Sequence, residues 1–525
     1  LGNLSLPEST HALVDGLDDA DALVRAACLR ALNQSQAASA LLDIAATLSD
    51  PEPDVRFEAV SALSALAGYP YGLMLYLAPL LDDKSTKVST RAAACLLRIN
   101  PEHDKAKKHL RHTAIFGDVE ARQHAIIALG DWGDVEAFEF LANELKDRTI
   151  LPAVQRIILV SLTRIDALRS MPYLVDSLRS EPLVLESTVG LLAGIGAPAL
   201  EPVLAALRDD DKVDGALLAL ERLPVPPAGT LLDFARMAVS RAAEYDGLMR
   251  GVQLAAGNAR AELGRSDAMS LLAESLRSKS NAHGIRALHA IGLLGDRNAM
   301  NTAVEHLQTR DMSQRANVIE ALESISAKWR DVLQPLMHLW EDDHAAHVDV
   351  NWDGLLNDGD EWIRECAAFA KTFGEKQMDS ITTLSLMDRI LFFKRVPLFA
   401  ALSPSDLKQV AAIAEEALFP DGEVIAHQGE QGDAMFVIVS GDVRVCIETD
   451  GVEAEVARRT TGEYVGELAI INREPRIATL IASGDVRALC IDQKSFEGLI
   501  RERPEVSLVI IQVLTKRLKE AMAKK

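Results

Sequence analysis

The sequence predicts a multidomain chain, in which an all-α solenoid of helical repeats precedes a small antiparallel β-barrel, jelly-roll-like, with flanking helices. The 525 residues exceed the roughly 300 that a single core usually reaches. Before about residue 400, helix-forming Ala and Leu dominate and almost nothing alternates with a period of two. After that point, short alternating runs separated by turn signals are typical of β-strands.

The helical part contains an internal repeat of about 31 to 33 residues within roughly its first 150 positions. Each unit consists of a helix, an Asp-rich turn and a second helix that starts near a Val-Arg or Ala-Arg pair. An Asp or Ser of the turn can cap the second helix, while the pair puts an apolar side chain inward and a basic one toward neighbouring acids. The repeated positions are Leu17, Asp18, Asp19, Val24 and Arg25; Leu48, Asp50, Val55 and Arg56; Leu81, Asp82, Asp83 and Val88; and Asp118, Ala121 and Arg122.

These units resemble HEAT repeats, in particular the short bacterial type also found in phycobilisome-lyase-like proteins. The resemblance implies a solenoid whose usual role is to hold a protein partner. The repeat fades after about residue 150, and the Pro-rich run 224–227 interrupts it. We therefore predict HEAT-like repeats over residues 1–223, further helical repeats over 224–375, an amphipathic helical linker over 376–402 and a last domain over 403–525.

The sequence of the last domain predicts a set of short strands followed by helices. Gly, Asp and Asn turn signals separate the strands. After Asp492 apolar residues fall at helical spacing, which predicts two closing helices. The expected strands are residues 423–427, 434–439, 443–447, 453–457, 477–482 and 486–491.

Residues 462–479 of this domain combine features that suit an anionic ligand. The glycines let the backbone approach a ligand closely, and a helix start at Glu467 points amide donors at an anion. Arg476 adds a planar guanidinium that can bind the anion. The Glu467 carboxylate would repel an anion, so it suits a ribose hydroxyl of the same ligand. This stretch is therefore the strongest candidate for a functional site.

The same stretch resembles the phosphate-binding cassette of cyclic nucleotide-binding domains, found in catabolite activator proteins, protein kinase A regulatory subunits and nucleotide-gated channels. The family pattern Phe-Gly-Glu-Leu-Ala, then Pro-Arg-x-Ala-Thr, is matched by residues 465–469 and 475–479, with Val465 in place of the Phe. A second signature, residues 429–441, precedes it in the expected order, and the resemblance extends over about residues 381–525.

The resemblance implies a role for each part of the cassette. Glu467 would accept a hydrogen bond from the ribose 2'-hydroxyl, and Arg476 would pair with the cyclic phosphate. Backbone amides around residues 468–469 and 477–478 would complete the phosphate cradle. The predicted binding residues are Val465, Gly466, Glu467, Leu468, Ala469, Pro475, Arg476, Ile477 and Ala478.

The bound species is expected to be a ligand rather than a cofactor. Relatives that prefer cGMP often carry a Thr after the Arg, so Ile477 favours cAMP, with cGMP as the alternative. No aromatic residue follows Phe496, so a lid over the base would be aliphatic or would use Gln512, Thr515 or Arg517.

Two functions fit this organisation. In the first, a cAMP-sensing regulatory protein transmits ligand binding through the amphipathic run 384–402 to the HEAT repeats, which bind an unknown protein. In the second, the chain is the cytoplasmic regulatory portion of a membrane transporter, because the domain order resembles bacterial ADP/ATP translocase-like proteins. The chain begins at Leu1 without Met, so we expect a processed product or the C-terminal part of a longer protein; in the second function, a transmembrane half or other membrane domain would be absent from this chain.

Other functional classes find little support. The net charge of −22 disfavours nucleic acid, whose phosphates attract Lys and Arg clusters. The sequence has no Gly-x-Ser-x-Gly, Cys-x-x-Cys or Walker motif, so we predict no enzyme. The run 458–461, Arg-Arg-Thr-Thr, is interpreted as a strand end rather than a kinase substrate site. Five scattered cysteines and no apolar run of about 18 residues predict a cytoplasmic chain without a membrane span.

A calcium loop is an alternative interpretation of residues 349–360. The spacing of their oxygen ligands fits such a loop, with Asp360 in place of the usual Glu. The same residues also fit a HEAT turn, and a helix running into that turn would exclude the calcium loop. The candidate ligands are Asp349, Asn351, Asp353, Asn357 and Asp360.

Overall fold

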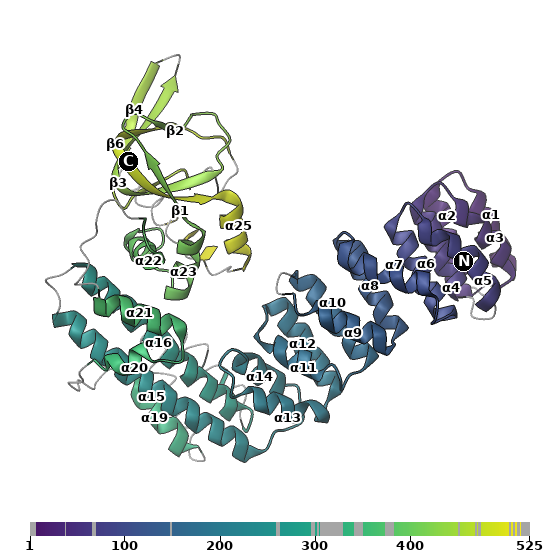
Figure 1. The fold of residues 1–525 in the computed structure, drawn as a ribbon, viewed down its shortest axis with the longest axis horizontal. Coiled ribbons are helices and arrows are strands. Elements are labelled where there is room, and N and C mark those ends of the chain that lie inside the picture. The colour runs from purple at the N-terminus through teal and green to yellow at the C-terminus, as the bar shows by residue number, and fades with distance from the viewer. Residues whose placement is uncertain are drawn as a thin grey trace. The chain divides into compact units, whose positions relative to one another are not determined.

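The computed structural model divides the chain into two compact units (Figure 1). The first unit contains Leu1–Arg236 and Arg286–Arg310, and the second contains Met237–Ile285 and Asp311–Lys525. The four-part division expected from the sequence stays a prediction. The structure describes residues 7–36, 38–65, 70–147, 150–258, 263–295, 300–301, 304, 329–340, 350–372, 383–449, 452–467, 470, 474–502, 506–507, 510–511 and 515.

The first unit is built from short helices that follow one another as repeats, which confirms the predicted solenoid. Each even-numbered helix from α2 to α14 packs against the next even-numbered helix along the chain. The helices are α1 (Pro7–Asp15), α2 (Ala22–Ser35), α3 (Leu41–Ala46), α4 (Pro53–Ala65), α5 (Pro70–Leu77), α6 (Thr86–Ile99), α7 (Asp104–Phe116), α8 (Val119–Trp132), α9 (Val135–Glu144), α10 (Pro152–Ile165), α11 (Met171–Asp176), α12 (Pro182–Ile195), α13 (Ala197–Ala206) and α14 (Val213–Leu220).

The arginines of the first two repeated pairs join one repeat to the next, as the sequence predicts, whereas Arg122 donates to the Ala114 carbonyl at 3.0 Å. Arg25 donates from Nε and Nη2 to the Asp50 carboxylate at 2.8 and 2.9 Å, and Arg56 binds Asp83 in the same way at 2.8 Å. Val55 is fully buried beside Arg56, whereas Val24 is 38% exposed, so the inward position of the Val is wrong for the first repeat.

The turn residues cap helices only in part. Asp118 accepts a hydrogen bond from the Ala121 amide at 2.8 Å, as expected for an N-cap. Ser85 precedes α6 without a side-chain cap, and Asp83 instead accepts from the Ser85 amide at 2.8 Å. The Asp of this turn therefore serves both the turn and the arginine of the previous repeat.

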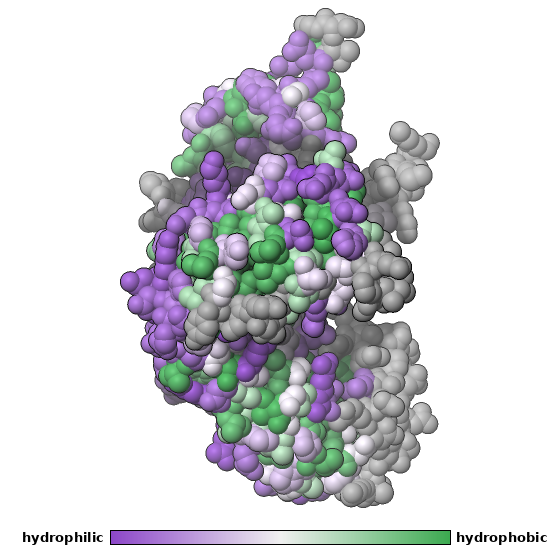
Figure 2. All heavy atoms as spheres, turned by 90° about the vertical axis from the view of Figure 1, so that its right-hand side faces the viewer, coloured by the Kyte–Doolittle hydropathy of each residue, from purple (hydrophilic) through white to green (hydrophobic). Residues whose placement is uncertain are grey.

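Exposed apolar side chains in the first unit lie on separate helices. Leu23, Leu42 and Leu75 are 75%, 69% and 80% exposed on α2, α3 and α5. Figure 2 shows one face of the molecule, on which hydrophobic residues are interspersed with hydrophilic ones. Scattered apolar residues of this kind are usual on protein surfaces and do not by themselves mark an interface.

The second unit combines helices with a β-sheet. Helices α15 and α16 are 31 and 30 residues long, and each crosses from one unit into the other. Among the described residues, none of the helices is both long and hydrophobic enough to cross a bilayer. The helices are α15 (Ala228–Asn258), α16 (Leu263–Gly292), α19 (Arg330–Trp340), α20 (Trp352–Leu356), α21 (Glu361–Thr372), α22 (Leu386–Arg395), α23 (Pro404–Ile413) and α25 (Gln493–Glu502).

The sheet is antiparallel, with strand order β1-β6-β3-β4, while β2 pairs with β6 and β5 with β3. The predicted antiparallel strands are confirmed, but in the described residues β1 and β4 remain edges, so the sheet does not close into a barrel. The strands are β1 (Glu415–Phe419), β2 (Val424–Ala426), β3 (Ala434–Thr449), β4 (Val452–Arg459), β5 (Tyr464–Val465) and β6 (Thr479–Asp492).

Strands β3 and β6 each join two of the predicted strands. The turn signal at Gly441 lies inside β3, where the pairing register with β6 shifts on either side of Ser440. Gly441 has a φ of +83°, and a Cβ there would lie 2.5 Å from the Asp485 carbonyl oxygen, so only glycine fits. The glycine bends the strand instead of ending it, because pairing with β6 continues on both sides.

Candidate functional site

A cavity of about 220 Å³ opens in the second unit beside the end of β4 and the segment between β5 and β6. Its walls come from four stretches of the chain, 445, 459, 464–467 and 474–480. They are brought together by the pairing of β3 with β4, β5 and β6. The lining residues are Val445, Arg459, Tyr464, Val465, Gly466, Glu467, Glu474, Pro475, Arg476, Ile477, Ala478 and Leu480.

The backbone of Arg476 is fixed by the segment that carries the second signature. Its amide donates to the Glu430 carbonyl at 2.7 Å, and its carbonyl accepts from the Gly429 amide at 2.8 Å. Pro475 forms an isolated β-bridge with Gln431. The two sequence signatures are therefore adjacent in space, and one holds the arginine of the other.

The side chain of Arg476 is only 5% exposed and its hydrogen bonding is incomplete. Nη2 donates to the Ala434 carbonyl at 2.9 Å, and the Asp433 carboxylate lies 3.7 Å from the same nitrogen. Nη1 is buried and has no hydrogen-bond partner among the described residues. A buried N–H without a partner is costly, so an acceptor that enters the cavity would relieve that cost.

The environment of Arg476 disfavours its charge without removing it. Burial lowers the pKa of the guanidinium, and the Asp433 carboxylate opposes this by raising it. Arginine nevertheless stays protonated in proteins. The Phe436 ring lies with its centroid 5.6 Å from the guanidinium carbon, which adds a cation–π contact. The cavity thus contains a poorly solvated positive charge, which suits an anionic ligand.

Gly466 makes room for that guanidinium. It has a φ of +83°, and a Cβ at this position would lie 2.6 Å from Nη1 of Arg476 and 3.0 Å from the Ala434 carbonyl oxygen. Both the backbone conformation and the close approach require glycine. Any side chain at residue 466 would displace the arginine.

The remaining predicted residues surround these two. Glu467 is half-buried and lines the cavity, and Ala478 is 6% exposed, whereas Ile477 is 66% exposed at the rim. Leu468 and Ala469 lie outside the described residues. The other predicted residues, Val465, Gly466, Glu467, Pro475, Arg476, Ile477 and Ala478, all line the same cavity.

Comparison with known proteins agrees with this geometry. Residues 416–503 match the family model of the cyclic nucleotide-binding domain. The C-terminal module is a cyclic nucleotide-binding domain. Residues 10–96 match the family model of HEAT repeats, so the N-terminal repeats are HEAT repeats.

The similar proteins share this domain rather than the whole chain. A cAMP-dependent protein kinase regulatory subunit from Mucor circinelloides f. lusitanicus is 34% identical over 109 residues, which are 21% of this chain and 26% of that protein. A Cyclic AMP receptor protein from Thermus thermophilus is 31% identical over 129 residues, 24% of this chain and 60% of that protein. The chain thus spans about a quarter of the length of the first.

A solved structure of the regulatory domain of Toxoplasma gondii PKA with cAMP is 29% identical, covers 26% of this chain and 50% of that one, and gives a TM-score of 0.23. The Mucor and Thermus relatives are named as a regulatory subunit and a receptor protein. The resemblance to ADP/ATP translocases therefore has no support from these relatives.

Arg459 also lines the cavity of the cyclic nucleotide-binding domain, and it was not among the predicted site residues. The strand end predicted at the Arg458-Arg459 run is confirmed, since β4 ends at Arg459. Arg459 could have been found from the alternation of side chains along β4. Successive strand residues point to opposite faces, so only one of Arg458 and Arg459 can lie on the cavity face. Val445, Tyr464, Glu474 and Leu480 line the cavity as well and were also missed.

Helix α22 and the residues just before it are hydrogen-bonded to β1 and to the residue that precedes β1. The Leu384 amide donates to Glu416 of β1 at 2.9 Å, and Arg389 donates to the Ala414 carbonyl at 2.7 Å. Glu416 also forms an ion pair with Arg487 of β6. Burial would raise the pKa of Glu416, but the hydrogen bonds from Arg487 and Leu384 outweigh it and lower the pKa.

Helices α22 and α23 contact the helical repeats of the second unit. Lys394 of α22 pairs with Glu274 of α16, and Lys408 of α23 lies 3.3 Å from Glu365 and 4.7 Å from the centroid of the Trp362 ring, both on α21. The Trp362 indole also donates to Ser275 of α16 at 3.1 Å. Helices α22 and α23 therefore contact the adjacent repeats, and their apolar side chains share a hydrophobic core with β3 and β6 of the sheet.

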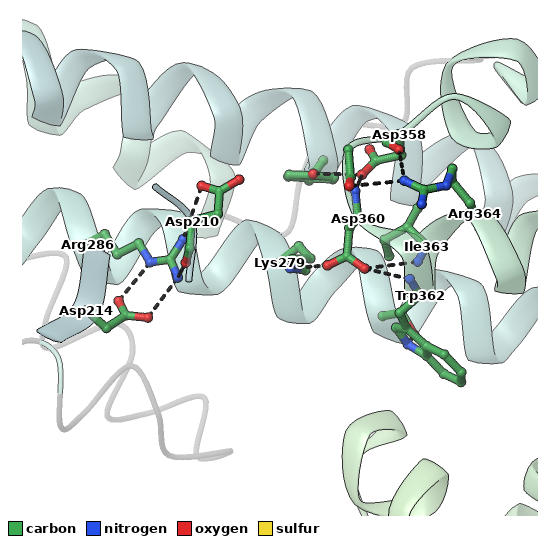
Figure 3. A network of polar contacts seen from close by, with 12 residues as sticks. Asp210, Asp214, Lys279, Arg286, Asp358, Asp360, Trp362, Ile363 and Arg364 are labelled. Atoms are coloured by element: carbon green, nitrogen blue, oxygen red, sulfur yellow. Dashed lines mark hydrogen bonds and ion pairs between the residues drawn. The ribbon is translucent and has the colours of Figure 1, made fainter. Parts of the chain in front are cut away.

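The residues proposed as a calcium loop cap helices instead. Helix α20 starts inside the loop, where the Asn351 side chain accepts from the Gly354 amide at 3.0 Å. Asp360 accepts from the amides of Trp362 and Ile363 at 2.8 and 3.3 Å and pairs with Lys279 (Figure 3). The alternative HEAT turn is the arrangement observed.

The structure gives no other indication of a metal site within the part of the chain that it describes. Asp349 lies outside that part. Among the residues that are described, no cluster of three or more His, Cys, Asp or Glu side chains could hold a metal ion. Asp360 already binds a cation and two amides, so the calcium-loop interpretation is wrong for this turn.

Proposed function

We propose that this protein is a cAMP-responsive regulator, in which the C-terminal domain binds cAMP and passes binding to the HEAT repeats. The observation that carries the proposal is the buried Arg476 guanidinium, which lines the cavity and whose Nη1 has no hydrogen-bond partner among the described residues. A cyclic phosphate supplies anionic acceptors in the size range of that cavity. Charge-assisted hydrogen bonds of this kind are about twice as strong as neutral ones.

The proposed roles follow the chemistry of each group. Arg476 binds the cyclic phosphate, and the glycine at 466 lets it lie against the backbone. Glu467, on the same cavity wall, accepts from the ribose 2'-hydroxyl. The remaining predicted residues, including Leu468 and Ala469, form the cradle. Removal of the phosphate charge or of the ribose hydroxyl is therefore expected to weaken binding.

The preference for cAMP over cGMP is supported by two observations. The Mucor and Thermus relatives are named for cAMP, and residue 477, directly after the arginine, is an exposed Ile without a hydroxyl. A Thr at that place is common in relatives that prefer cGMP. We therefore propose cAMP as the preferred ligand.

Calorimetric titration of the full chain tests the binding proposal. We expect saturable heat with cAMP in the micromolar range or tighter, because one buried guanidinium and several backbone donors meet one anion. Linear 5'-AMP is the control, since it has the same base and ribose but a different phosphate geometry. No heat with either cAMP or cGMP would contradict the proposal.

We further propose that α22 and α23 transmit binding. Apolar side chains of both helices share a hydrophobic core with β3 and β6, and Lys394 and Lys408 pair with Glu274 and Glu365 of the adjacent helices α16 and α21. A ligand can shift the position of these helices only if it binds one of two conformations of the protein more tightly than the other. Hydrogen exchange of the full chain should therefore change in α21, α22 and α23 when cAMP is added. Unchanged exchange in these helices despite cAMP binding would refute transmission by this route.

A further inference from the structure

We propose that Arg459 reads the base of the bound nucleotide and favours guanine, so that the site accepts cGMP in addition to cAMP. This inference rests on the proposed function, because it concerns the base of a ligand that the same cavity binds. It adds a specificity-determining residue outside the cassette, at the end of β4, whereas Glu467 and Arg476 lie between β5 and β6.

Arg459 lies on the cavity face of the sheet, at the last position of β4. It pairs directly with Val443 of β3, and Val445, two residues along on the same face of β3, lines the cavity with it. The preceding residue, Arg458, points to the other face. Its guanidinium binds Glu455 at 3.1 Å and Ser483 at 3.2 Å, and it is not part of the cavity lining.

A turn holds the Arg459 guanidinium at the cavity rim. Nη1 lies 3.4 Å from Glu463 Oε1, and Glu463 Oε2 accepts from the Thr460 amide at 2.9 Å. The Glu463 amide donates back to the Thr460 carbonyl at 3.0 Å, which closes the turn. The contact with Glu463 uses Nη1, whereas a guanidinium has five N–H donors in a planar fork. Arg459 is 37% exposed and can reach a ligand without first being desolvated.

Arg459 is a lining residue that the proposed phosphate and ribose contacts do not use. In the proposed function, Arg476 takes the phosphate and Glu467 takes the ribose. Val445 and Leu480 provide an apolar wall, which suits the flat face of a purine. Tyr464 and Glu474 also line the described part of the cavity, but of the lining side chains besides Arg476 only the Arg459 guanidinium presents several donors in one plane, as an acceptor edge of a base requires.

The two purines present different edges to such a donor fork. Guanine offers two acceptors, O6 and N7, whereas adenine offers the N7 acceptor beside the N6 amino donor. An arginine can therefore make two hydrogen bonds to guanine and one to adenine. A bidentate pair of this kind typically changes discrimination by about tenfold or more.

The test is calorimetric titration of the full chain with cAMP and with cGMP. We expect Arg459→Ala to weaken cGMP binding about tenfold and cAMP binding about threefold or less, which raises the preference for cAMP. Arg459→Lys keeps the charge near Glu463 but lacks the planar fork, so it should lose most of the same cGMP affinity. Arg458→Ala removes the same charge one residue away, outside the cavity, and should leave both affinities unchanged.

The outcomes separate this inference from the proposed function. If the wild type binds cAMP but not cGMP, or if both Arg459 variants keep the wild-type ratio of affinities, Arg459 does not read the base and the proposed function stands. If the wild type binds neither nucleotide, the proposed function fails and this inference fails with it. Circular dichroism checks the folding of each variant, and the Lys variant decides the question if the Ala variant unfolds.

Discussion

Arg56 of the HEAT repeats and Arg476 of the cyclic nucleotide-binding domain differ in how far their hydrogen-bond donors are satisfied. Arg56 is 14% exposed and donates from two nitrogens to Asp83 of the next repeat. Arg476 is more buried, at 5%, yet Nη1 has no partner among the described residues. We infer that Arg56, which is paired with Asp83, stabilises the repeats, whereas Arg476, which lines a cavity, keeps a donor for a ligand at some cost in stability to the unliganded domain.

The substitution Arg476→Ala is the strongest test of the proposed difference between Arg56 and Arg476. We expect cAMP affinity to fall by about 100-fold or more, because a charge-assisted contact of about 3 kcal/mol is lost in a site sheltered from water. The free energy of unfolding without ligand should change little, since the buried cation lacks a full set of partners. Calorimetry and urea unfolding measure the two quantities. A large loss of stability with cAMP affinity retained would place Arg476 with the structural arginines.

The converse experiment is Arg56→Ala in the repeats. We expect the first unit to lose about 2 kcal/mol of unfolding free energy, because two charge-assisted hydrogen bonds disappear and Asp83 is left half-buried without its cation. The affinity for cAMP should not change. Arg30→Ala is the matched control: Arg30 is 55% exposed in its pair with Glu58, so its loss should cost about 0.5 kcal/mol or less. Equal effects of the two substitutions would contradict the distinction.

Gly466→Ala tests whether Arg476 needs its space. The added Cβ would lie 2.6 Å from Nη1, so the guanidinium must move, and we expect cAMP affinity to fall about tenfold. Gly462→Ala separates this effect from backbone strain. Gly462 has a φ of +84°, nearly equal to that of Gly466, but a Cβ there meets nothing within 4 Å. If both variants lose the same affinity in calorimetry, strain rather than the close approach is responsible.

Acidification should affect the repeats through Asp83. Burial would raise its pKa, but hydrogen bonds from Arg56 and the Ser85 amide outweigh it, so its pKa in the folded protein lies below the ordinary value of 3.8. The pair therefore contributes its full stability above pH 3.8 and loses it as the pH falls through the lower, folded-state pKa.

The difference in stability between wild type and Arg56→Ala should then shrink from pH 6 toward pH 3, by about 1 kcal/mol. Urea unfolding at the two pH values measures it. If the difference in unfolding free energy between the two proteins is the same at pH 6 and pH 3, protonation of Asp83 does not weaken its pair with Arg56.

The sequence predicted much of the fold because its signals are local. The Asp turn and the Val-Arg pair at residues 55 and 56 predicted a helix after the turn and a basic side chain near acids, since helical period and capping depend on residues within one turn. Two strands were predicted on either side of Gly441 where the structure has one, because a glycine can end a strand or bend it. Only the pairing with β6 decides between them.

The sequence by itself determined the repeat type of the first unit and the Gly466, Glu467 and Arg476 cassette, because both depend on short spacings. The tertiary structure alone decided that Gly429 and Glu430 hold the Arg476 backbone and that Arg459 joins the cavity. It also decided that Nη1 of Arg476 is buried with no partner among the described residues. These facts depend on pairing between strands far apart in the chain, where a shift of one residue would turn each side chain to the opposite face.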